Sequence, residues 1–313
     1  MKVVVITGPT ACGKSDIGIK LAKKFNGEII SADSRQVYRK MDIGTGKVTG
    51  KTDLSYFLDI PPKLYPFISE GINHWLIDIL NPSEQFSVAD FQKYAEAIEQ
   101  NIKERKKNPF IVGGTGFFIR SLTEGLLFPN AKVTEETKNY VESMTYEDAL
   151  TKLLNRQNNA EEFIDIKNPR RVQRALSLLL SGMSNLSEMR MHKKPIAEYL
   201  VIGITYEREI INQRILKRLD NRLNQGMVKE IELLLKNKDV TPERLDDFGL
   251  EYRWIGKFVT GQITYDEMHK KLYTEICRFA KRQMTWFKKY CNVIWLNDEK
   301  QIIEMVDKFL KEI

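Results

Sequence analysis

A glycine-rich segment near the N-terminus has the residue types that hold phosphate groups. Residues 8–15 read GPTACGKS and match the pattern G-x-x-x-x-G-K-[ST] between an apolar run and a helix-like one. Glycines let backbone N–H groups turn towards an anion, and the start of a helix adds positive potential. The segment therefore predicts a bound di- or triphosphate group, without specifying ATP. Its phosphate-binding residues are Gly8, Pro9, Thr10, Ala11, Cys12, Gly13, Lys14 and Ser15.

Two residues of this segment carry chemistry beyond backbone N–H groups. Lys14 supplies a positive charge to the phosphates. The hydroxyl of Ser15 suits an Mg²⁺ ion that bridges two phosphate oxygens. We therefore expect Mg²⁺ as the cofactor and Ser15 as its protein ligand.

Asp33 and Thr115 each follow a predicted strand and should lie near the phosphate loop. The carboxyl ends of parallel strands border the ligand crevice of an open sheet. A carboxylate at residue 33 would accept a proton or bind metal there, and the glycine turn at residues 113–116 would let Thr115 reach a ligand. The sequence leaves a second reading open for both residues, since each would also serve as a helix cap or turn residue.

Basic residues concentrate in two stretches of the second half of the chain, although the net charge is only +7. Residues 165–224 contain twelve Lys and Arg against six Asp and Glu, and residues 277–290 contain five against none. Phe279, Trp286, Phe287 and Tyr290 alternate with the charges of the second stretch. Such a surface would follow phosphates and stack bases. The alternative is a solvated basic helix whose aromatic residues face the core.

These residues need a sheet and helices to position them. Apolar runs predict strands at residues 2–7, 28–31, 75–79, 109–112, 199–206 and 293–296, and apolar spacing predicts helices at residues 14–25 and 87–107. Prolines and glycines predict an irregular excursion at residues 45–73. Alternating strands and helices imply an α/β fold with a parallel sheet and right-handed crossovers. Its domains would be a core of residues 1–122 and 196–313 and a helical insertion of residues 123–195, which would close over a substrate.

Composition excludes several classes of protein. A hydrophobic fraction of 42% is normal for a globular chain. No apolar run approaches the roughly 18 residues that span a bilayer, so we expect no membrane partner. Three cysteines without a CxxC pattern predict a cytoplasmic protein without structural zinc. The guanine signature Asn-Lys-x-Asp is absent, which disfavours a GTPase.

The motifs taken in order resemble the tRNA dimethylallyltransferase family, also called tRNA isopentenyltransferases, in its bacterial form. The segments that carry the resemblance are GPTACGKS, ISADSRQVYRKMDIGTGK, HWLIDIL, FSVADF, VGGTGFFIRSLTEGL, NPRRVQRAL and AKRQMTWF. The family transfers a dimethylallyl group from its diphosphate to N6 of adenosine 37 in tRNA, giving N6-dimethylallyladenosine. The resemblance implies a P-loop NTPase-like core with a helical insertion that contacts tRNA.

The same resemblance implies roles for individual residues. Asp33 would be the catalytic base, with Thr115 near the target base and Lys14 on the leaving diphosphate. Arg208 or Arg214, in the basic helix after a strand, would clamp the diphosphate. The residues implied in tRNA binding are Asp33, Ser34, Arg35, Gln36, Thr115, Arg170, Arg171, Val172, Gln173, Arg174, Lys281 and Arg282.

The partners implied are tRNA, through its anticodon stem-loop, and dimethylallyl diphosphate, with the protein acting as a monomer. Three other functions remain open from the sequence, one of them a non-catalytic, nucleotide-gated RNA-binding protein in which Asp33 and Thr115 would only be caps. A P-loop kinase of small molecules would share the phosphate loop, as would an enzyme that prenylates free adenine nucleotides. The two basic stretches argue against both, because a mononucleotide needs neither.

Overall fold

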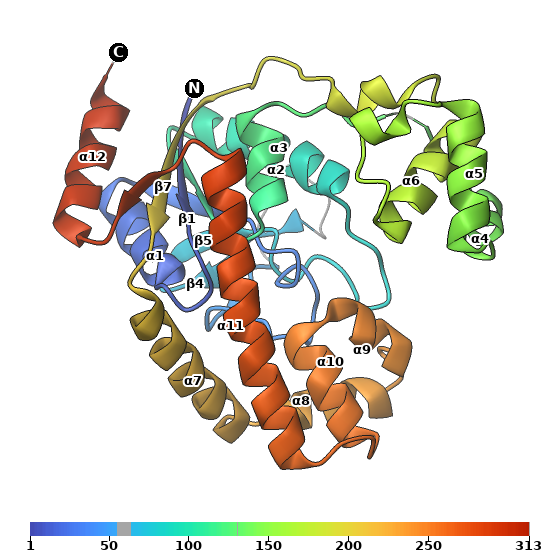
Figure 1. Ribbon diagram of the computed structural model, residues 1–313. Helices are drawn as coiled ribbons and strands as arrows, with labels where there is room; N and C mark the ends of the chain where they lie inside the picture. The colour runs from blue at the N-terminus through green and yellow to red at the C-terminus, as the bar shows by residue number, and fades with distance from the viewer. Residues whose placement is uncertain (55–63, 130, 313) are drawn as a thin grey trace. The chain divides into compact units, whose positions relative to one another are not determined.

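Two compact units make up the chain. The computed structural model describes residues 1–54, 64–129 and 131–312. Backbone contacts separate a core unit, Met1–Thr123 with Ile196–Ile313, from an insertion unit, Glu124–Pro195 (Figure 1). Each unit has an apolar core of its own. The sequence predicts the insertion at residues 123–195.

An eight-stranded sheet forms the centre of the core unit, in the order β3-β4-β5-β2-β6-β1-β7-β8. The six strands from β5 to β8 in this order run parallel, whereas β3 and β4 run antiparallel to their neighbours. The strands are β1 Lys2–Thr7, β2 Gly27–Ser31, β3 Lys51–Thr52, β4 Phe67–Ser69, β5 Ile72–Trp75, β6 Asn108–Val112, β7 Glu198–Ile204 and β8 Ile294–Leu296.

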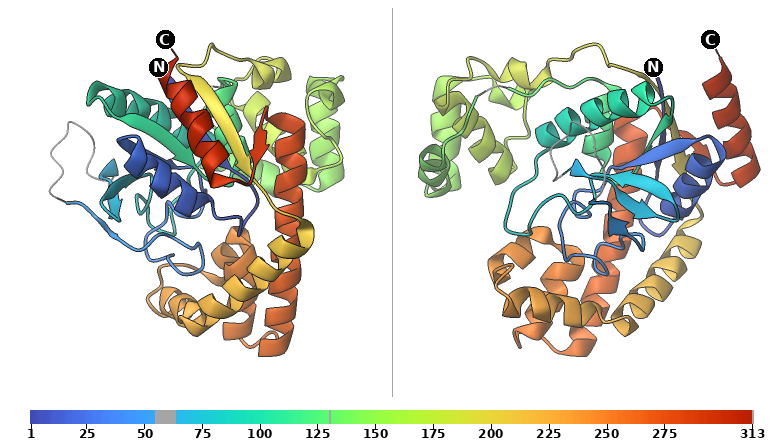
Figure 2. Two further views of the ribbon diagram at one scale, coloured as in Figure 1. Left: turned by 90° about the vertical axis from the view of Figure 1, so that its left-hand side faces the viewer. Right: turned by 180° about the vertical axis from the view of Figure 1, so that it is seen from behind.

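Helices cover both faces of this sheet. The β1–α1–β2 and β5–α2–β6 crossovers move across the sheet in opposite directions, so their right-handedness places α1 and α2 on opposite faces. Helix α12 joins α1 through an ion pair between Lys20 and Glu299, 2.6 Å apart, and α3 packs on α2 (Figure 2). The helices are α1 Lys14–Lys24, α2 Val88–Glu104, α3 Gly116–Thr123 and α12 Glu299–Lys311.

A second group of helices extends from the carboxyl end of the sheet. It contains the 26-residue helix α11, which packs against α3, α7 and α10. Its helices are α7 Arg208–Asn224, α8 Met227–Lys236, α9 Pro242–Phe248, α10 Leu250–Val259 and α11 Tyr265–Tyr290. No helix in the described ranges is both long and apolar enough to cross a lipid bilayer.

Most predicted elements are confirmed, and the α/β class with them. The prediction of a strand at residues 75–79 is wrong, because that strand ends at Trp75. Leu76 and Asp78 adopt left-handed backbone, with φ of 63° and 57°, which breaks the strand. The excursion at residues 45–73 is also more regular than predicted, since it contributes β3 and β4 and begins β5. Its residues 55–63 lie outside the described ranges.

The insertion unit is helical, as predicted. Its helices are α4 Glu135–Glu142, α5 Tyr146–Arg156 and α6 Pro169–Leu180, with short 3-10 turns at Ala160–Glu162 and Leu186–Arg190. Asn168 caps α6 by accepting hydrogen bonds from the amides of Arg170 and Arg171. The helices enclose a separate cluster of buried apolar side chains, which gives this unit its own stability.

Candidate active site

The predicted phosphate loop connects β1 to α1, and its conformation depends on two glycines. Gly13 is the N-cap of α1 and has φ of 90°. Gly8 has φ of 141°, and a Cβ there would clash with a backbone carbonyl oxygen of β7. Lys14 starts the helix, and its Nζ donates to the carbonyl oxygen of Pro9 at 2.7 Å. The loop therefore places a helix N-terminus and an ammonium group together. The Cys12 side chain is buried.

Asp33 and Thr115 lie just beyond the carboxyl ends of neighbouring strands, in turns that are hydrogen-bonded to each other. Asp33 Oδ1 accepts a hydrogen bond from the amide of Arg35 at 2.8 Å. Thr115 Oγ1 accepts a hydrogen bond from the amide of Ser34 at 3.1 Å, and the Thr115 amide donates one to the carbonyl oxygen of Ala32. Both side chains also line the same cavity. The turn reading is therefore confirmed for both residues, and the ligand reading stays a prediction.

Two cavities of the core unit meet at the phosphate loop. The first, about 290 Å³ in volume, contains Asp33 and Thr115 together with Thr10 of the loop. The second, about 480 Å³, lies on the other side and contains Ala11 and Gly13. The residues common to both walls are Lys14, Ser15, Gly46, Arg218 and Arg222. A ligand held at this junction is accessible from both cavities.

Two arginines of α7 border the junction. Arg218 donates a hydrogen bond from Nη2 to the Thr10 hydroxyl in the loop. Burial, together with the smaller effect of the nearby charge of Arg222, lowers the pKa of Arg218 to about 10. Arg222 Nη1 lies 3.6 Å from Glu251 Oε1. The two arginines, Arg218 and Arg222, are near enough to repel each other, and an anion between them would relieve that repulsion.

The arginines implied by the resemblance lie elsewhere. Arg214 is one turn before Arg218 and lines the second cavity, where its guanidinium lies 4.0 Å from the Tyr206 ring centre. Arg208 lines neither of the two cavities. It borders a third one, about 510 Å³, together with Lys281. The geometry therefore assigns the loop-facing position to Arg218, for which no role was predicted from the sequence.

Gln283 of α11 joins the two glycine turns. Its Oε1 accepts from the Thr10 amide at 2.9 Å, and its Nε2 donates to the carbonyl oxygen of Gly114 at 2.9 Å. The side chain is only 8% exposed. Lys281 and Arg282, the predicted tRNA-binding residues beside it, are exposed. One helix therefore contributes both a buried clamp on the loop and an exposed basic face.

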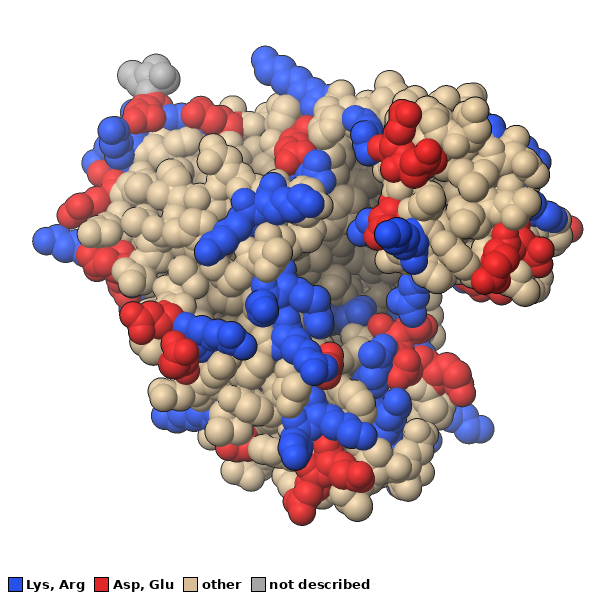
Figure 3. Space-filling view, viewed as in Figure 1, with Lys and Arg blue, Asp and Glu red and all other residues tan. Residues whose placement is uncertain are grey.

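The basic stretch at residues 277–290 combines the two readings that the sequence left open. Lys and Arg residues gather over α11 on the face that Figure 3 shows. Within residues 277–290 the exposed ones are Arg278, Lys281, Arg282, Lys288 and Lys289. Phe287 is fully buried in the core, as the alternative reading expected, whereas Phe279 lines the first cavity. The charges form a surface, and only part of the aromatic set faces the core.

Residues 248–252 complete the first cavity, and no role for them was predicted. Phe248 and Tyr252 line it and contact each other edge to face, with ring centres 5.8 Å apart. The guanidinium of Arg35 lies 5.2 Å from the Phe248 ring centre. Aromatic and cationic groups around a small cavity suit a planar nucleobase.

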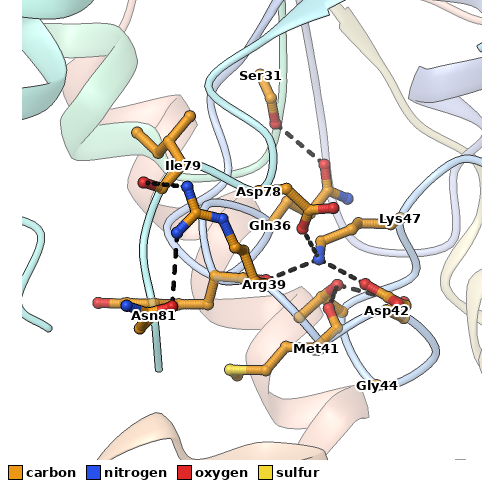
Figure 4. Close-up of polar contacts among 12 residues, drawn as sticks. Ser31, Gln36, Arg39, Met41, Asp42, Gly44, Lys47, Asp78, Ile79 and Asn81 are labelled. Carbon is orange, nitrogen blue, oxygen red and sulfur yellow. Dashed lines mark hydrogen bonds and ion pairs between the residues drawn. The ribbon is translucent and has the colours of Figure 1, made fainter. Parts of the chain in front are cut away.

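Gly44, Thr45 and Gly46 of the loop at residues 41–47 also line the first cavity. Lys47 holds the end of this loop (Figure 4). The Lys47 side chain is 2% exposed, and its Nζ contacts the Tyr38 carbonyl oxygen at 2.7 Å, Asp42 Oδ1 at 2.6 Å and Asp78 Oδ1. Burial raises the pKa of Asp78, while the ammonium of Lys47 acts in the opposite direction. Gln36 links the Asp33 turn to this loop, since its Nε2 lies 3.4 Å from the Gly46 carbonyl oxygen.

Of the tRNA-binding residues predicted in the insertion unit, one is in the wrong environment. Arg170, Arg171 and Arg174 are exposed on α6, and Gln173 is half-buried. Val172 is fully buried in the apolar core of the unit. Helical periodicity turns residue 172 away from its charged neighbours, so its side chain cannot contact RNA.

Comparison with known proteins gives matches over nearly the whole chain. The family model described as IPP transferase matches residues 36–290, and a model described as isopentenyl transferase matches residues 1–55. The tRNA dimethylallyltransferase of Staphylococcus saprophyticus is 37% identical, over 97% of this chain and 94% of its own. The chain belongs to the IPP transferase family. The tRNA dimethylallyltransferase of Carboxydothermus hydrogenoformans is 36% identical, over 99% and 97% of the two chains.

Solved structures of the IPP transferase family share the fold. The tRNA isopentenylpyrophosphate transferase of Bacillus halodurans gives a TM-score of 0.69 at 32% identity, covering 99% of this chain and 95% of its own. A eukaryotic dimethylallyltransferase described as acting on tRNA gives 0.78 at 24% identity, covering 99% of this chain and 79% of its own, and shows likeness of fold alone. The resemblance drawn from the sequence motifs is thus confirmed.

Proposed function

We propose that this protein transfers the dimethylallyl group of dimethylallyl diphosphate to N6 of adenosine 37 in tRNA. Membership of the IPP transferase family, whose bacterial relatives are named tRNA dimethylallyltransferases, supports this assignment. The observation that carries it is the meeting of two cavities at Lys14, Ser15 and Arg218, with Asp33 in only one of them. One side suits an allylic diphosphate, and the other suits the base that it alkylates.

In this proposal the loop at residues 8–15 is a P-loop that holds the leaving diphosphate. The loop amides, the N-terminus of α1 and the Lys14 ammonium stabilise negative charge as it develops. Arg218 is anchored to the loop through Thr10, so its remaining N–H groups can reach the same phosphate oxygens. The parallel α/β sheet and the glycine conformations of the loop support this finer assignment of the fold.

The donor set of the site fits Mg²⁺ held mainly by phosphate oxygens and water. No cluster of three or more His, Cys, Asp or Glu side chains suited to a metal occurs in the described part of the chain. The Ser15 hydroxyl and the Asp33 carboxylate nevertheless line one cavity, and both are oxygen ligands of the kind Mg²⁺ accepts. Ser15 would hold the ion, which supplies positive charge to the diphosphate.

Asp33 acts as the general base in this proposal. The N6 nitrogen of adenine is a weak nucleophile, so its proton must leave as the N–C bond forms. The new bond joins N6 to the allylic carbon, the C–O bond to diphosphate breaks, and its electron pair departs with the diphosphate. The Asp33 carboxylate takes the N6 proton. Thr115 holds the Asp33 turn through the Ser34 amide.

Access from two sides separates the substrates. The tRNA base, extruded from the anticodon loop, enters the first cavity beside Phe248 and Tyr252, and the diphosphate enters through the second. Exposed cations on α11 and on α6 of the insertion unit follow the tRNA phosphates. One chain lines both cavities, so a monomer suffices.

A single assay tests the proposal against its alternatives. The protein is incubated with Mg²⁺, dimethylallyl diphosphate and unmodified tRNA, and the digested tRNA is analysed by mass spectrometry. We expect the added mass on adenosine 37 alone. Parallel reactions contain AMP in place of tRNA, or ATP in place of the allylic diphosphate. Prenylated AMP without prenylated tRNA would instead indicate an enzyme that prenylates free adenine nucleotides. Phosphate transfer from ATP would indicate a small-molecule kinase.

A further inference from the structure

Glu230 of α8 holds the backbone of the cavity wall at residues 42–44. Its Oε2 accepts hydrogen bonds from the amides of Asp42 at 2.8 Å and Ile43 at 2.6 Å, and its Oε1 accepts one from Gly44 at 3.1 Å. One carboxylate thus binds three successive amides, contributed from a helix distant in sequence. Hydrogen bonds to a charged acceptor are stronger than neutral ones, so this contact fixes the turn firmly.

The same carboxylate also fixes Tyr252 in the first cavity. The Tyr252 hydroxyl donates to Glu230 Oε1 at 2.9 Å. Burial raises the pKa of Tyr252 well above its ordinary value, and the negative charge of Glu230 contributes, so the hydroxyl stays a donor. The ring packs against Gly44, where a Cβ would lie only 2.7 Å from it. Glu230 therefore sets the distance between the loop and the aromatic wall.

The loop in turn sets the position of Arg222. A Cβ at Gly46 would clash with the Arg222 guanidinium, and Arg222 Nη1 lies 3.5 Å from the Gly44 carbonyl oxygen. Gly46 and Arg222 both line the junction of the two cavities. Lys47 closes the other end of the loop through Asp42 and Asp78 (Figure 4). The loop is thus held at both ends, and its free edge faces the junction.

We propose that Glu230 is a positioning residue for the diphosphate site, acting through residues 42–46 and Arg222. This inference rests on the proposed function, because it assumes that the junction binds diphosphate. Glu230 touches neither reacting group. Its carboxylate keeps the Gly44–Gly46 backbone and the Arg222 guanidinium in place before the diphosphate arrives, as residues behind a metal ligand orient that ligand.

The test compares Glu230→Gln with Glu232→Gln. Glutamine at residue 230 keeps the length of the side chain, but its NH₂ group would face a backbone amide. Glu232 lies on the same helix and forms an ion pair with Lys229 on the surface. Binding of inorganic diphosphate in the presence of Mg²⁺ is measured by calorimetry on protein shown to be folded by circular dichroism. We expect Glu230→Gln to bind about tenfold more weakly than the parent, with Glu232→Gln unchanged.

Hydrogen exchange of the loop amides locates the cause. In Glu230→Gln, the amides of Asp42, Ile43 and Gly44 should exchange faster than in the parent. Equal affinity in the folded Glu230→Gln variant would overturn the inference, and so would weaker binding with these amides still protected. A parent protein that binds no diphosphate would refute the proposed function and this inference with it. That result is distinguishable, because Glu232→Gln would then fail as well.

Tyr252→Phe provides a second variant if Glu230→Gln does not fold. It removes one of the four hydrogen bonds to the carboxylate and leaves the three amide bonds in place. We expect a smaller loss of diphosphate affinity, about two- to threefold, with modestly faster exchange at Gly44. Affinity equal to that of the parent would exclude the link from Tyr252 through Glu230 to the diphosphate site.

Discussion

The side chain of Gln283 accepts a hydrogen bond from the backbone amide of Thr10, 2.9 Å away, although 273 residues separate the two in sequence. The other end of the same amide group donates to Gly114. Helix α11 therefore fixes the phosphate loop relative to the glycine turn that carries Thr115. Under the proposed function, the geometry of the site would depend on this link between α11 and the beginning of the chain.

Replacing Gln283 with methionine should damage activity more than folding. Methionine has a similar volume but leaves the Thr10 amide without its acceptor. The phosphate loop is then no longer held in a fixed position relative to Gly114. We expect kcat/KM to fall about tenfold to a hundredfold, measured with saturating tRNA and varied dimethylallyl diphosphate. Gln301→Met, at an exposed position of α12, is the control. Unchanged kcat/KM would show that the loop is held without α11.

Arg218 and Arg208 should differ sharply as diphosphate ligands. Arg218→Gln removes the cation anchored to Thr10, and we expect kcat/KM for dimethylallyl diphosphate to fall about a hundredfold or more. Arg208→Gln should leave it within about twofold, because Arg208 lines neither of the two cavities that meet at the loop. If Arg208→Gln lowers kcat/KM more than Arg218→Gln in the same steady-state assay, Arg208 binds the diphosphate instead.

The affinity for tRNA should fall steeply with salt. Lys281 and Arg282 are exposed on α11, and neutralising phosphates with such side chains releases counterions. Changing both to Glu should reduce the slope of log K against log salt by about two. Changing Lys300 and Lys308 of α12 to Glu is the matched control. If the tRNA affinity of the parent protein does not change with salt, Lys281 and Arg282 do not contact phosphates and are ordinary solvated surface charges.

The buried Glu99 should make stability depend on pH. Burial raises its pKa to about 8 from an ordinary 4.5, although Tyr199 donates a hydrogen bond to Oε2 at 3.0 Å. Its Oε1 is buried and has no hydrogen-bond partner among the residues that the structure describes. Between these pH values the folded state keeps a proton that the unfolded state releases, so this group's contribution to stability falls as pH rises.

Glu99→Gln removes that titration. The melting temperature of the variant relative to the parent should therefore rise between about pH 5 and about pH 8.5. Glu104→Gln, exposed on the same helix, should show a constant difference. A difference for Glu99→Gln that does not change with pH would mean that Glu99 titrates normally in the folded protein.

Local sequence predicted the parts of the fold that depend on local chemistry. The apolar run of β1, the glycine loop and the helix after it are contiguous, and the structure has β1 at the predicted residues. The strand at residues 72–75 was predicted too late in the sequence, at residues 75–79. The reason is that the apolar residues Leu76 and Ile77 follow the strand, although the backbone turns after Trp75. The short β3 and β4 pair with each other, and pairing at such a distance leaves little local signal.

The candidate site was predicted only where its residues follow strands. Asp33 and Thr115 were found because parallel strands deliver their ends to one edge. Gln283 and Glu230 act through contacts with distant segments, which single-residue patterns do not contain. Arg218 had a usable signal, since Arg214, Arg218 and Arg222 are spaced four apart and share one face of α7. Two of these three border the junction of both cavities.

The most direct test of the account is the single-turnover rate of Asp33→Asn with tRNA and dimethylallyl diphosphate. Asparagine keeps an oxygen for the Arg35 amide, so the turn is preserved while the base is lost. We predict a rate about 10²- to 10⁴-fold below the parent, with the affinities for tRNA and for inorganic diphosphate unchanged. A rate equal to that of the parent would contradict the assignment of Asp33 as the base and, with it, the division of the site into a base side and a diphosphate side.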